Sequence, residues 1–367
     1  MKALSRIERL RNLMDEENLD AIVVSAITDL MWLTGFEYVF DSEQAHVAFI
    51  TKDECVIHTD CRYSTAMKNA AKSEGLWIVD DKYENHSEFI GRLADKRLLS
   101  ACNIAIDKMT PLAFYKALKK RLPDAQFIER ENDIFKLREQ KDLAEIENIK
   151  LAQACAEAGF KEMLSEIHEG MTEREVSLIL EFAMRKNGAD ELSFPNIVAS
   201  GPNSANPHAI PSNRKLKSGD LVVFDFGARI NGYCSDTTRT ISIGKPSEEQ
   251  KRIYNAVRLA NEEVEKSLHA GVTGKQMHIL AEEVLQDAGF GGKMGHALGH
   301  GVGLNVHENP TLSPKAEAAL REGSIVTVEP SVYISGENGV RLEDFGCVKA
   351  SSFDNFCKLP HDMYILE

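Results

Sequence analysis

Residues 216–241, LKSGDLVVFDFGARINGYCSDTTRTI, contain two apolar segments joined by a short polar turn. The segments 221–230 and 233–241 are rich in β-branched and aromatic residues, as strands are. Asn231-Gly232 lies between them, and this dipeptide is the strongest signal for a two-residue hairpin turn. The stretch therefore predicts an antiparallel β-hairpin.

The hairpin carries two aspartates. A two-residue turn would place Thr238 opposite Asp225 and Asp236 opposite Gly227. Because side chains alternate faces along a strand, both aspartates would lie on one face as diagonal neighbours. We expect Gly227 to leave open space beside them.

The second half of the chain contains an internal repeat. Residues 170–175 (GMTERE) match residues 271–276 (GVTGKQ), and both have the capping-box form in which Thr precedes Glu or Gln by three residues. Residues 216–225 (LKSGDLVVFD) match residues 320–329 (LREGSIVTVE) in the same order. Repeated segments in one order and at a nearly constant separation indicate a duplicated α/β unit.

The duplication supplies two further carboxylates. Glu329 occupies the position equivalent to Asp225, at the end of an apolar segment, so we predict a strand over 325–334. A returning strand is predicted over 340–348, and Glu343 is its acidic residue. A pseudo-twofold arrangement of the two units would bring both hairpins against a common axis.

Four carboxylates at one point repel one another unless they are protonated or neutralised. Two divalent cations would balance the four side chains, Asp225, Asp236, Glu329 and Glu343. An oxygen-rich site favours Mn²⁺, with Co²⁺, Fe²⁺ or Zn²⁺ as alternatives. A neutral imidazole could complete the set, and the glycine-rich run 296–303 (HALGHGVG) offers His296 and His300.

These motifs resemble the pita-bread metallopeptidases of family M24, specifically the proline-specific branch that contains prolidase (Xaa-Pro dipeptidase) and aminopeptidase P. The segments that carry the resemblance are FPNIVASG (194–201), NPH (206–208), DFG (225–227), GYCSDTTRT (232–240), GHGVG (299–303), VHE (306–308), VEP (328–330) and VRLED (340–344). The first 130 residues resemble, more weakly, the creatinase-type amino-terminal domain, around LTGF (33–36) and DCRY (60–63).

The resemblance implies the fold class, an α/β (α+β) chain. A creatinase-like amino-terminal α/β domain over 1–130 would precede a pseudo-twofold pita-bread catalytic domain over 135–367. The polar segment at 129–133 (EREND) is where we place the boundary. Within the amino-terminal part, apolar segments predict strands; these are residues 20–25, 46–51, 55–59 and 103–107.

The resemblance also implies the site. Five residues would hold two metal ions, namely Asp225, Asp236, His300, Glu329 and Glu343, with Asp236 and Glu343 bridging the ions. Four further residues would act on the substrate or on the ligands, namely His208, His296, His307 and Arg341. Thr238 is expected to hydrogen-bond a ligand carboxylate. Ser331 stands where the family commonly has glycine.

The implied activity is hydrolysis of the peptide bond that precedes proline, in the manner of an Xaa-Pro dipeptidase. Aminopeptidase P, which releases the first residue of longer Xaa-Pro peptides, is the alternative. A non-catalytic pita-bread protein that binds peptides is a distant alternative. A homodimer is expected, because in this family the amino-terminal domain of one subunit can border the active site of its neighbour.

The composition excludes other partners. The 43 Lys and Arg against 57 Asp and Glu give a net charge of −14, which repels nucleic acid and anionic membranes. No apolar run approaches the roughly 20 residues of a membrane-spanning helix. The seven cysteines form no C-x-x-C pair. We therefore expect a cytoplasmic protein with reduced thiols and no nucleic-acid or membrane partner.

Overall fold

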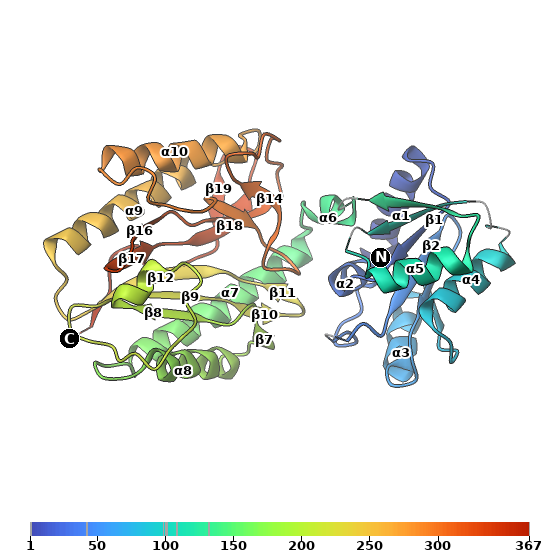
Figure 1. Ribbon diagram of the computed structural model, residues 1–367, viewed down its shortest axis with the longest axis horizontal. Helices are drawn as coiled ribbons and strands as arrows, with labels where there is room; N and C mark the ends of the chain where they lie inside the picture. The colour runs from blue at the N-terminus through green and yellow to red at the C-terminus, as the bar shows by residue number, and fades with distance from the viewer. Residues whose placement is uncertain are drawn as a thin grey trace. The chain divides into compact units, whose positions relative to one another are not determined.

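The computed structural model describes residues 2–41, 43–97, 99, 102–107, 109–130 and 133–366. The chain divides into two compact units, Met1–Arg138 and Glu139–Glu367 (Figure 1). Glu131 and Asn132, in the segment where we placed the domain boundary, lie outside the described residues. None of the described helices is long and apolar enough to cross a membrane.

The first unit is built on a six-stranded mixed sheet with the strand order β4-β3-β2-β1-β5-β6. The strands are β1 (Ala21–Val24), β2 (Val47–Thr51), β3 (Cys55–His58), β4 (Trp77–Asp80), β5 (Asn103–Asp107) and β6 (Gln126–Arg130). The helices are α1 (Lys2–Glu16), α2 (Ile27–Thr34), α3 (Ser64–Glu74), α4 (His86–Lys96), α5 (Leu112–Arg121) and α6 (Asp133–Arg138). The four strands predicted in this part are confirmed as β1, β2, β3 and β5.

Alternate residues of the central strands form one buried cluster of this unit. Ala21 and Val23 of β1 share a buried cluster with Val47 and Phe49 of β2 and with residues of α4 and α5. A spacing of two residues is what a strand requires to direct side chains to one face. The sheet therefore buries one face under α4 and α5.

The second unit contains four long helices around several short sheets. The helices are α7 (Leu143–Leu164), α8 (Glu173–Lys186), α9 (Glu248–Ser267) and α10 (Gly274–Asp287), and η1 (Gly201–Ala205) is a 3₁₀ turn. The strands are β7 (Glu191–Leu192), β8 (Ile197–Ser200), β9 (Leu221–Phe226), β10 (Ala228–Ile230), β11 (Tyr233–Cys234), β12 (Thr237–Ile243), β13 (Gly299–Gly301), β14 (Glu308–Leu312), β15 (Ile325–Val328), β16 (Ser331–Ile334), β17 (Asn338–Arg341), β18 (Asp344–Val348), β19 (Phe353–Asn355) and β20 (Ile365–Leu366).

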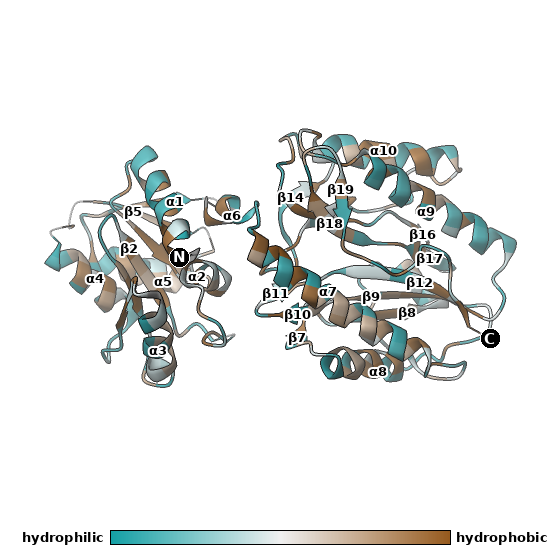
Figure 2. Ribbon diagram, turned by 180° about the vertical axis from the view of Figure 1, so that it is seen from behind, coloured by the Kyte–Doolittle hydropathy of each residue, from teal (hydrophilic) through white to brown (hydrophobic). Residues whose placement is uncertain are grey.

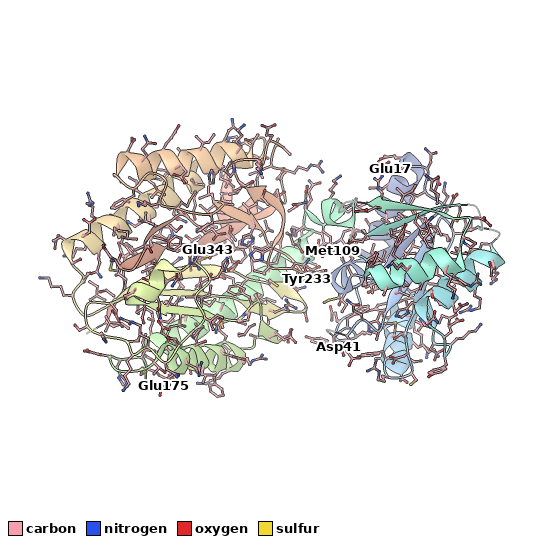
Figure 3. All side chains as sticks on the ribbon, in the orientation of Figure 1. Glu17, Asp41, Met109, Glu175, Tyr233 and Glu343 are labelled. Carbon is pink, nitrogen blue, oxygen red and sulfur yellow. The ribbon has the colours of Figure 1, made fainter. Side chains whose placement is uncertain are left out.

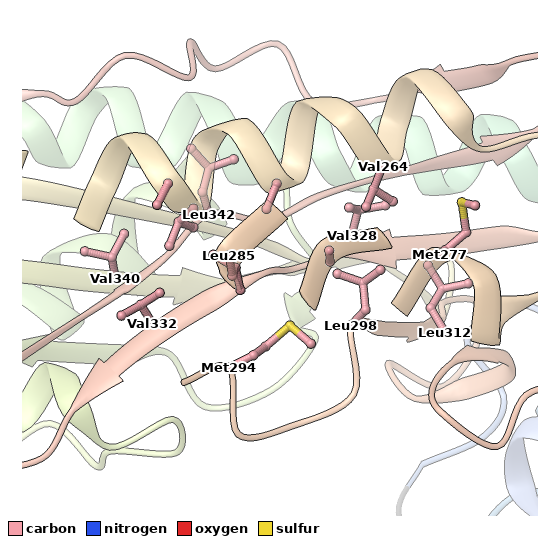
Figure 4. Packing of buried hydrophobic residues seen from close by; sticks show 14 of the residues in the cluster. Val264, Met277, Leu285, Met294, Leu298, Leu312, Val328, Val332, Val340 and Leu342 are labelled. Carbon is pink, nitrogen blue, oxygen red and sulfur yellow. The ribbon is translucent and has the colours of Figure 1, made fainter. Parts of the chain in front are cut away.

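The helices pack in pairs on opposite sides of the strands. Helices α7 and α8 share one buried cluster with β8, β9 and β12, whereas α9 and α10 share another with β15, β16 and β17. Figure 4 shows the second cluster, which contains Leu285 of α10 together with Val332, Val340 and Leu342. Figure 2 shows apolar strands enclosed between helices of mixed hydropathy. This layered arrangement is the predicted pita-bread fold.

The predicted duplication is confirmed by matching hydrogen bonds. Thr172 and Thr273 each cap their helix through a complete capping box, with Glu175 and Gln276 as partners. In the first half, Gly170 N donates to Leu216 O at 2.9 Å. In the second half, Gly271 N donates to Leu320 O, also at 2.9 Å. The same local design therefore occurs twice.

The predicted hairpin register is correct. Thr238 pairs with Asp225 in the ladder of β9 and β12, and Ile230 pairs with Tyr233 beside the turn. The strand predicted over 221–230 is nevertheless interrupted at Gly227, because β9 pairs with β8 whereas β10 pairs with β7 in a different sheet.

The expectation that Gly227 leaves open space is wrong. A Cβ atom at this position would lie 2.0 Å from the carbonyl oxygen of Ser235. The missing side chain therefore lets the two backbones approach closely, and the position is filled.

The second hairpin is interrupted at the equivalent place. The strand predicted over 325–334 consists of β15 and β16, and the strand predicted over 340–348 consists of β17 and β18. The break falls at Glu329-Pro330, where proline has no amide hydrogen to continue the ladder. Both hairpins thus change sheets beside their acidic residues.

Candidate metal centre

The four predicted carboxylates lie at these strand interruptions. Asp236 directly precedes β12, Glu329 directly follows β15, and Glu343 directly precedes β18, whereas Asp225 is the penultimate residue of β9. Figure 3 shows Glu343 in the interior of the second unit, among strands of both halves. The breaks free these positions from regular ladders, so that their side chains can be directed into one shared space.

His300 joins the acidic residues from β13. Its Nε2 lies 3.6 Å from Asp236 Oδ2 and 3.4 Å from Glu329 Oε1. Ligand atoms of Asp236, His300 and Glu343 all lie within 4.8 Å of one another. His300 Nδ1 lies 3.0 Å from the carbonyl oxygen of Gly301 and can only donate to it. This bond fixes the tautomer and leaves the Nε2 lone pair facing the carboxylates.

Asp225 is connected to the cluster through Arg341. The Arg341 guanidinium donates to Asp225 Oδ2 through Nη2, and its Nε donates to Thr238 Oγ1 at 3.1 Å. Its Nη1 donates to the Tyr333 hydroxyl at 2.7 Å and to the Pro207 carbonyl oxygen at 3.2 Å. The Arg341 guanidinium thus holds a carboxylate of the first half from a strand of the second half.

Burial and mutual repulsion disturb the titration of the acidic side chains. Burial, followed by the charges of Glu343, Asp225 and Glu329, raises the pKa of Asp236 well above its usual value. Burial and the nearby Glu329 and Asp225 do the same to the pKa of Glu343. Burial raises the pKa of Glu329 to about 8. The cluster therefore resists carrying its full negative charge without cations.

The histidine titrates in the opposite sense. Burial, with a smaller effect of neighbouring His307, lowers the pKa of His300 to about 4. At neutral pH its imidazole is therefore uncharged and has a free lone pair. A neutral imidazole beside ionisable carboxylates is a donor set suited to a divalent transition-metal ion.

Hydroxyl groups orient two of the carboxylates. Thr238 Oγ1 donates to Glu343 Oε2 at 2.7 Å, as we predicted for this threonine. Thr327 Oγ1 donates to Glu329 Oε1 at 3.2 Å and accepts from the His300 amide at 3.0 Å. Such contacts fix ligand orientation and tune metal affinity.

The residues present fit a pair of divalent cations. The buried Oδ1 of Asp225 has no hydrogen-bond partner in the part of the chain that is described, although its other oxygen binds Arg341. A buried carboxylate oxygen that lacks a donor is costly unless a cation satisfies it. Asp225, Asp236, His300, Glu329 and Glu343 would hold the ions.

The other predicted histidines lie around this cluster. The rings of His300 and His307 are 4.3 Å apart between centroids. His208 is exposed, but it is close enough to contribute to lowering the pKa of both His296 and His307, after the larger effect of burial. His296 Nδ1 approaches Glu329 Oε2 at 4.0 Å. The structure thus brings all nine predicted site residues into one region.

Two residues in this region were not among the predictions for the site. Tyr333 links Arg341 to His296, since its hydroxyl lies 3.2 Å from His296 Nε2. Ser331 Oγ lies 2.8 Å from the same nitrogen. Ser331 pairs with Arg341 across β16 and β17, which makes Tyr333 the diagonal neighbour of Arg341. This register is the signal that could have revealed Ser331 and Tyr333 as site residues.

Comparisons with known proteins agree with this architecture. Residues 147–350 match Metallopeptidase family M24, and residues 6–140 match the Creatinase/Prolidase N-terminal domain. An Xaa-Pro dipeptidase of Pyrococcus horikoshii is 33% identical over 92% of this chain and 93% of its own length.

Two solved structures are similar over nearly the whole chain. An Xaa-Pro dipeptidase from Bacillus anthracis has 36% identity and a TM-score of 0.93, covering 99% of this chain and 100% of its own. An X-Pro aminopeptidase from Thermotoga maritima has 33% identity and a TM-score of 0.89, covering 98% and 99% of the two chains. This chain therefore belongs to metallopeptidase family M24 and carries a creatinase/prolidase N-terminal domain before the peptidase region.

Proposed function

We propose that this protein is an Xaa-Pro dipeptidase that uses two divalent ions, preferentially Mn²⁺. The observation that carries the proposal is the approach of His300 to Asp236 of the first hairpin and Glu329 of the second. Relatives and structural neighbours that bear the name Xaa-Pro dipeptidase support the substrate class. The oxygen-rich donor set supports Mn²⁺ over a softer ion.

The Xaa-Pro bond differs chemically from other peptide bonds, so its cleavage calls for a dedicated site. The nitrogen of an Xaa-Pro bond carries no hydrogen, so the bond lacks the donor that ordinary peptide-binding sites use. When bound, the ions would supply Lewis-acid activation of a water and of the scissile carbonyl. The remaining work falls to side chains of the chain itself.

Three groups would handle protons and developing charge. Glu329, which lies beside His300, would accept a proton from the attacking water and deliver it to the leaving proline nitrogen. His208 and His307 would donate hydrogen bonds to the carbonyl oxygen as negative charge develops there. Arg341 would hold Asp225 in place, and His296 would border the substrate.

The test is cleavage of Ala-Pro beside Ala-Pro-Ala, with Mn²⁺ added. We expect the dipeptide to be cleaved and the tripeptide to be a poor substrate. Preferential cleavage of the tripeptide would instead assign aminopeptidase P activity, the alternative supported by the likeness to the Thermotoga maritima X-Pro aminopeptidase. Cleavage of neither, with peptide binding retained, would favour the non-catalytic binding protein.

Matched variants test the metal ligands. Asp236→Ala and the isosteric Asp236→Asn should abolish cleavage and reduce the bound Mn²⁺ measured by elemental analysis. Asp287→Asn, an exposed change at the end of α10, should alter neither. Full activity in Asp236→Ala would contradict the mechanism.

We further propose a cytoplasmic homodimer with a creatinase-like domain over 1–130 and a catalytic domain over 135–367. All seven cysteines are free, which suits a reducing compartment. Light scattering on the purified protein would test the dimer, and limited proteolysis would test the boundary.

A further inference from the structure

A buried carboxylate outside the metal cluster accepts several hydrogen bonds. Glu173 is the first residue of α8 and its side chain is inaccessible to solvent. It accepts hydrogen bonds from neutral donors on three residues, Ser200, Asn203 and Ser212. These bonds lower the pKa of Glu173 although burial by itself raises it. The side chain is therefore held as a carboxylate, and the amino-terminal end of the helix also favours negative charge.

The donors lie on both sides of His208. Glu173 Oε1 accepts from the Ser200 amide at 2.8 Å and from the Ser200 hydroxyl at 2.7 Å, at the last residue of β8. Oε2 accepts from the Ser212 amide at 3.0 Å and from the Ser212 hydroxyl at 2.6 Å, in the middle of the connection between β8 and β9. Asn203 reaches both oxygens. One carboxylate thus joins the two ends of the segment that carries His208.

The helix backbone strengthens the same connection. The amide of Glu173 donates to Arg214 O at 3.0 Å, and the amide of Arg174 donates to Ser212 O at 3.1 Å. Within the loop, Pro207 accepts a hydrogen bond from Arg341, which also binds Asp225. The residue before His208 is therefore also held in place by Arg341.

In the second half of the duplication, a different contact holds the histidine segment against its helix. Gly274 begins α10 at the position equivalent to Glu173, directly after the capping threonine. A Cβ at Gly274 would lie 2.1 Å from the carbonyl oxygen of Thr311, in the segment that follows His307. The second histidine segment is thus packed directly on Gly274, whereas the first is bound at both of its ends by the Glu173 carboxylate.

We propose that Glu173 is the positioning residue for His208: its carboxylate joins both ends of residues 200–212 and so places the imidazole over the substrate carbonyl. This inference rests on the proposed function for the role of His208 in hydrolysis. Glu173 itself acts through the loop and does not contact the reacting atoms.

The first test is a double-mutant cycle. In Glu173→Gln an amide NH₂ replaces one oxygen and cannot accept the hydrogen bonds made at one end of the loop. We expect kcat on Ala-Pro to fall by about 10- to 100-fold, as for a misplaced catalytic group, with Mn²⁺ content unchanged. Glu173→Gln combined with His208→Ala should be no slower than His208→Ala alone, because the first change acts through the second residue.

Glu175→Gln is the matched control. It removes a carboxylate from the same helical turn but preserves the capping box, as Gln276 does in the other half. We expect it to keep the wild-type kcat. A fall in kcat that is fully additive with His208→Ala, or a Glu173→Gln enzyme as fast as the control, would overturn the proposal.

Hydrogen exchange provides a readout that needs no catalysis. Amides of residues 201–213 should exchange faster in Glu173→Gln than in wild type or Glu175→Gln, while the strands that carry the metal ligands stay protected. Unchanged exchange in this loop would overturn the proposal. If wild type cleaves no Xaa-Pro peptide, the proposed function fails, and the exchange comparison still decides whether Glu173 holds the loop.

Ser212→Ala covers the case in which Glu173→Gln does not fold. This change deletes a single hydroxyl donor and leaves the buried carboxylate intact. Faster exchange of residues 201–213, with a smaller fall in kcat, supports the proposal. Wild-type exchange and wild-type kcat in Ser212→Ala together with an unfolded Glu173→Gln would assign Glu173 to stability alone.

Discussion

Thr238 and Glu343 meet where the two hairpins touch. Thr238 Oγ1 donates to Glu343 Oε2 at 2.7 Å, and the Glu343 amide donates to Thr238 O at 3.1 Å. One residue of the first half thus holds both the backbone and the carboxylate of a residue in the second half. This pair links the duplicated units at the proposed metal centre.

Removal of the Thr238 hydroxyl should weaken metal binding. Thr238→Val keeps the β-branched shape but deprives Glu343 of its donor, and also deprives the Arg341 Nε of its acceptor. We expect the affinity for Mn²⁺ to fall by about 10- to 100-fold in calorimetric titration. Thr240→Val is the control, because its hydroxyl accepts from the Arg341 amide rather than contacting a carboxylate. Equal affinities of the two variants would contradict this role.

Metal binding should release protons. In the metal-free protein the pKa of Glu329 is about 8, and those of Asp236 and Glu343 are also raised, so protons occupy the cluster at pH 7. Cations require the deprotonated carboxylates, and affinity should therefore rise as the pH rises towards 8. Titration heats measured in buffers of different ionisation enthalpy would count the released protons. Buffer-independent heats would show that the cluster is already ionised.

A side chain at Gly227 should displace Asp236. In Gly227→Ala the new Cβ would lie 2.0 Å from Ser235 O, so the backbone next to Asp236 must move. We expect Mn²⁺ affinity and activity to fall together. Gly188→Ala is the control. Gly188 has a φ of 108°, so this substitution should lower the free energy of unfolding by about 1–2 kcal/mol without affecting the cluster. Normal metal affinity in Gly227→Ala would refute the close-packing argument.

The stability provided by the contact between His361 and Asp344 should fall at alkaline pH. The pKa of His361 is raised, chiefly by its hydrogen bond to Asp344, which also pairs with buried Arg239. A raised pKa means that the stabilisation is complete below the ordinary value of 6.5 and is lost as the pH rises through the folded-state pKa.

His361→Gln should therefore lower the thermal midpoint more at pH 6 than at pH 9. His269→Gln serves as the comparison, since the His269 ring bonds to the adjacent Ala270 carbonyl. A destabilisation by His361→Gln that is the same at both pH values would show that the charge of His361 does not contribute.

Local patterns were sufficient for much of the fold. The Asn231-Gly232 turn determines the pairing of Thr238 with Asp225, because a two-residue turn leaves a single register. The capping boxes at Thr172 and Thr273 likewise depend on residues three positions apart. The repeated spacing of acidic residues then indicated which carboxylates should converge.

Long-range packing decided the rest. The strand break at Gly227 depends on which neighbouring strand each segment meets, and no local pattern encodes this choice. The break beside Glu329 is different, because Pro330 marks it in the sequence. Arg341 binds Asp225, which is distant in sequence. Glu173 accepts hydrogen bonds from Ser200 and Ser212, which are separated by an irregular loop. Sequence determines the chemistry and local geometry of these residues, whereas only the tertiary structure specifies their partners, because those depend on how separately formed elements pack.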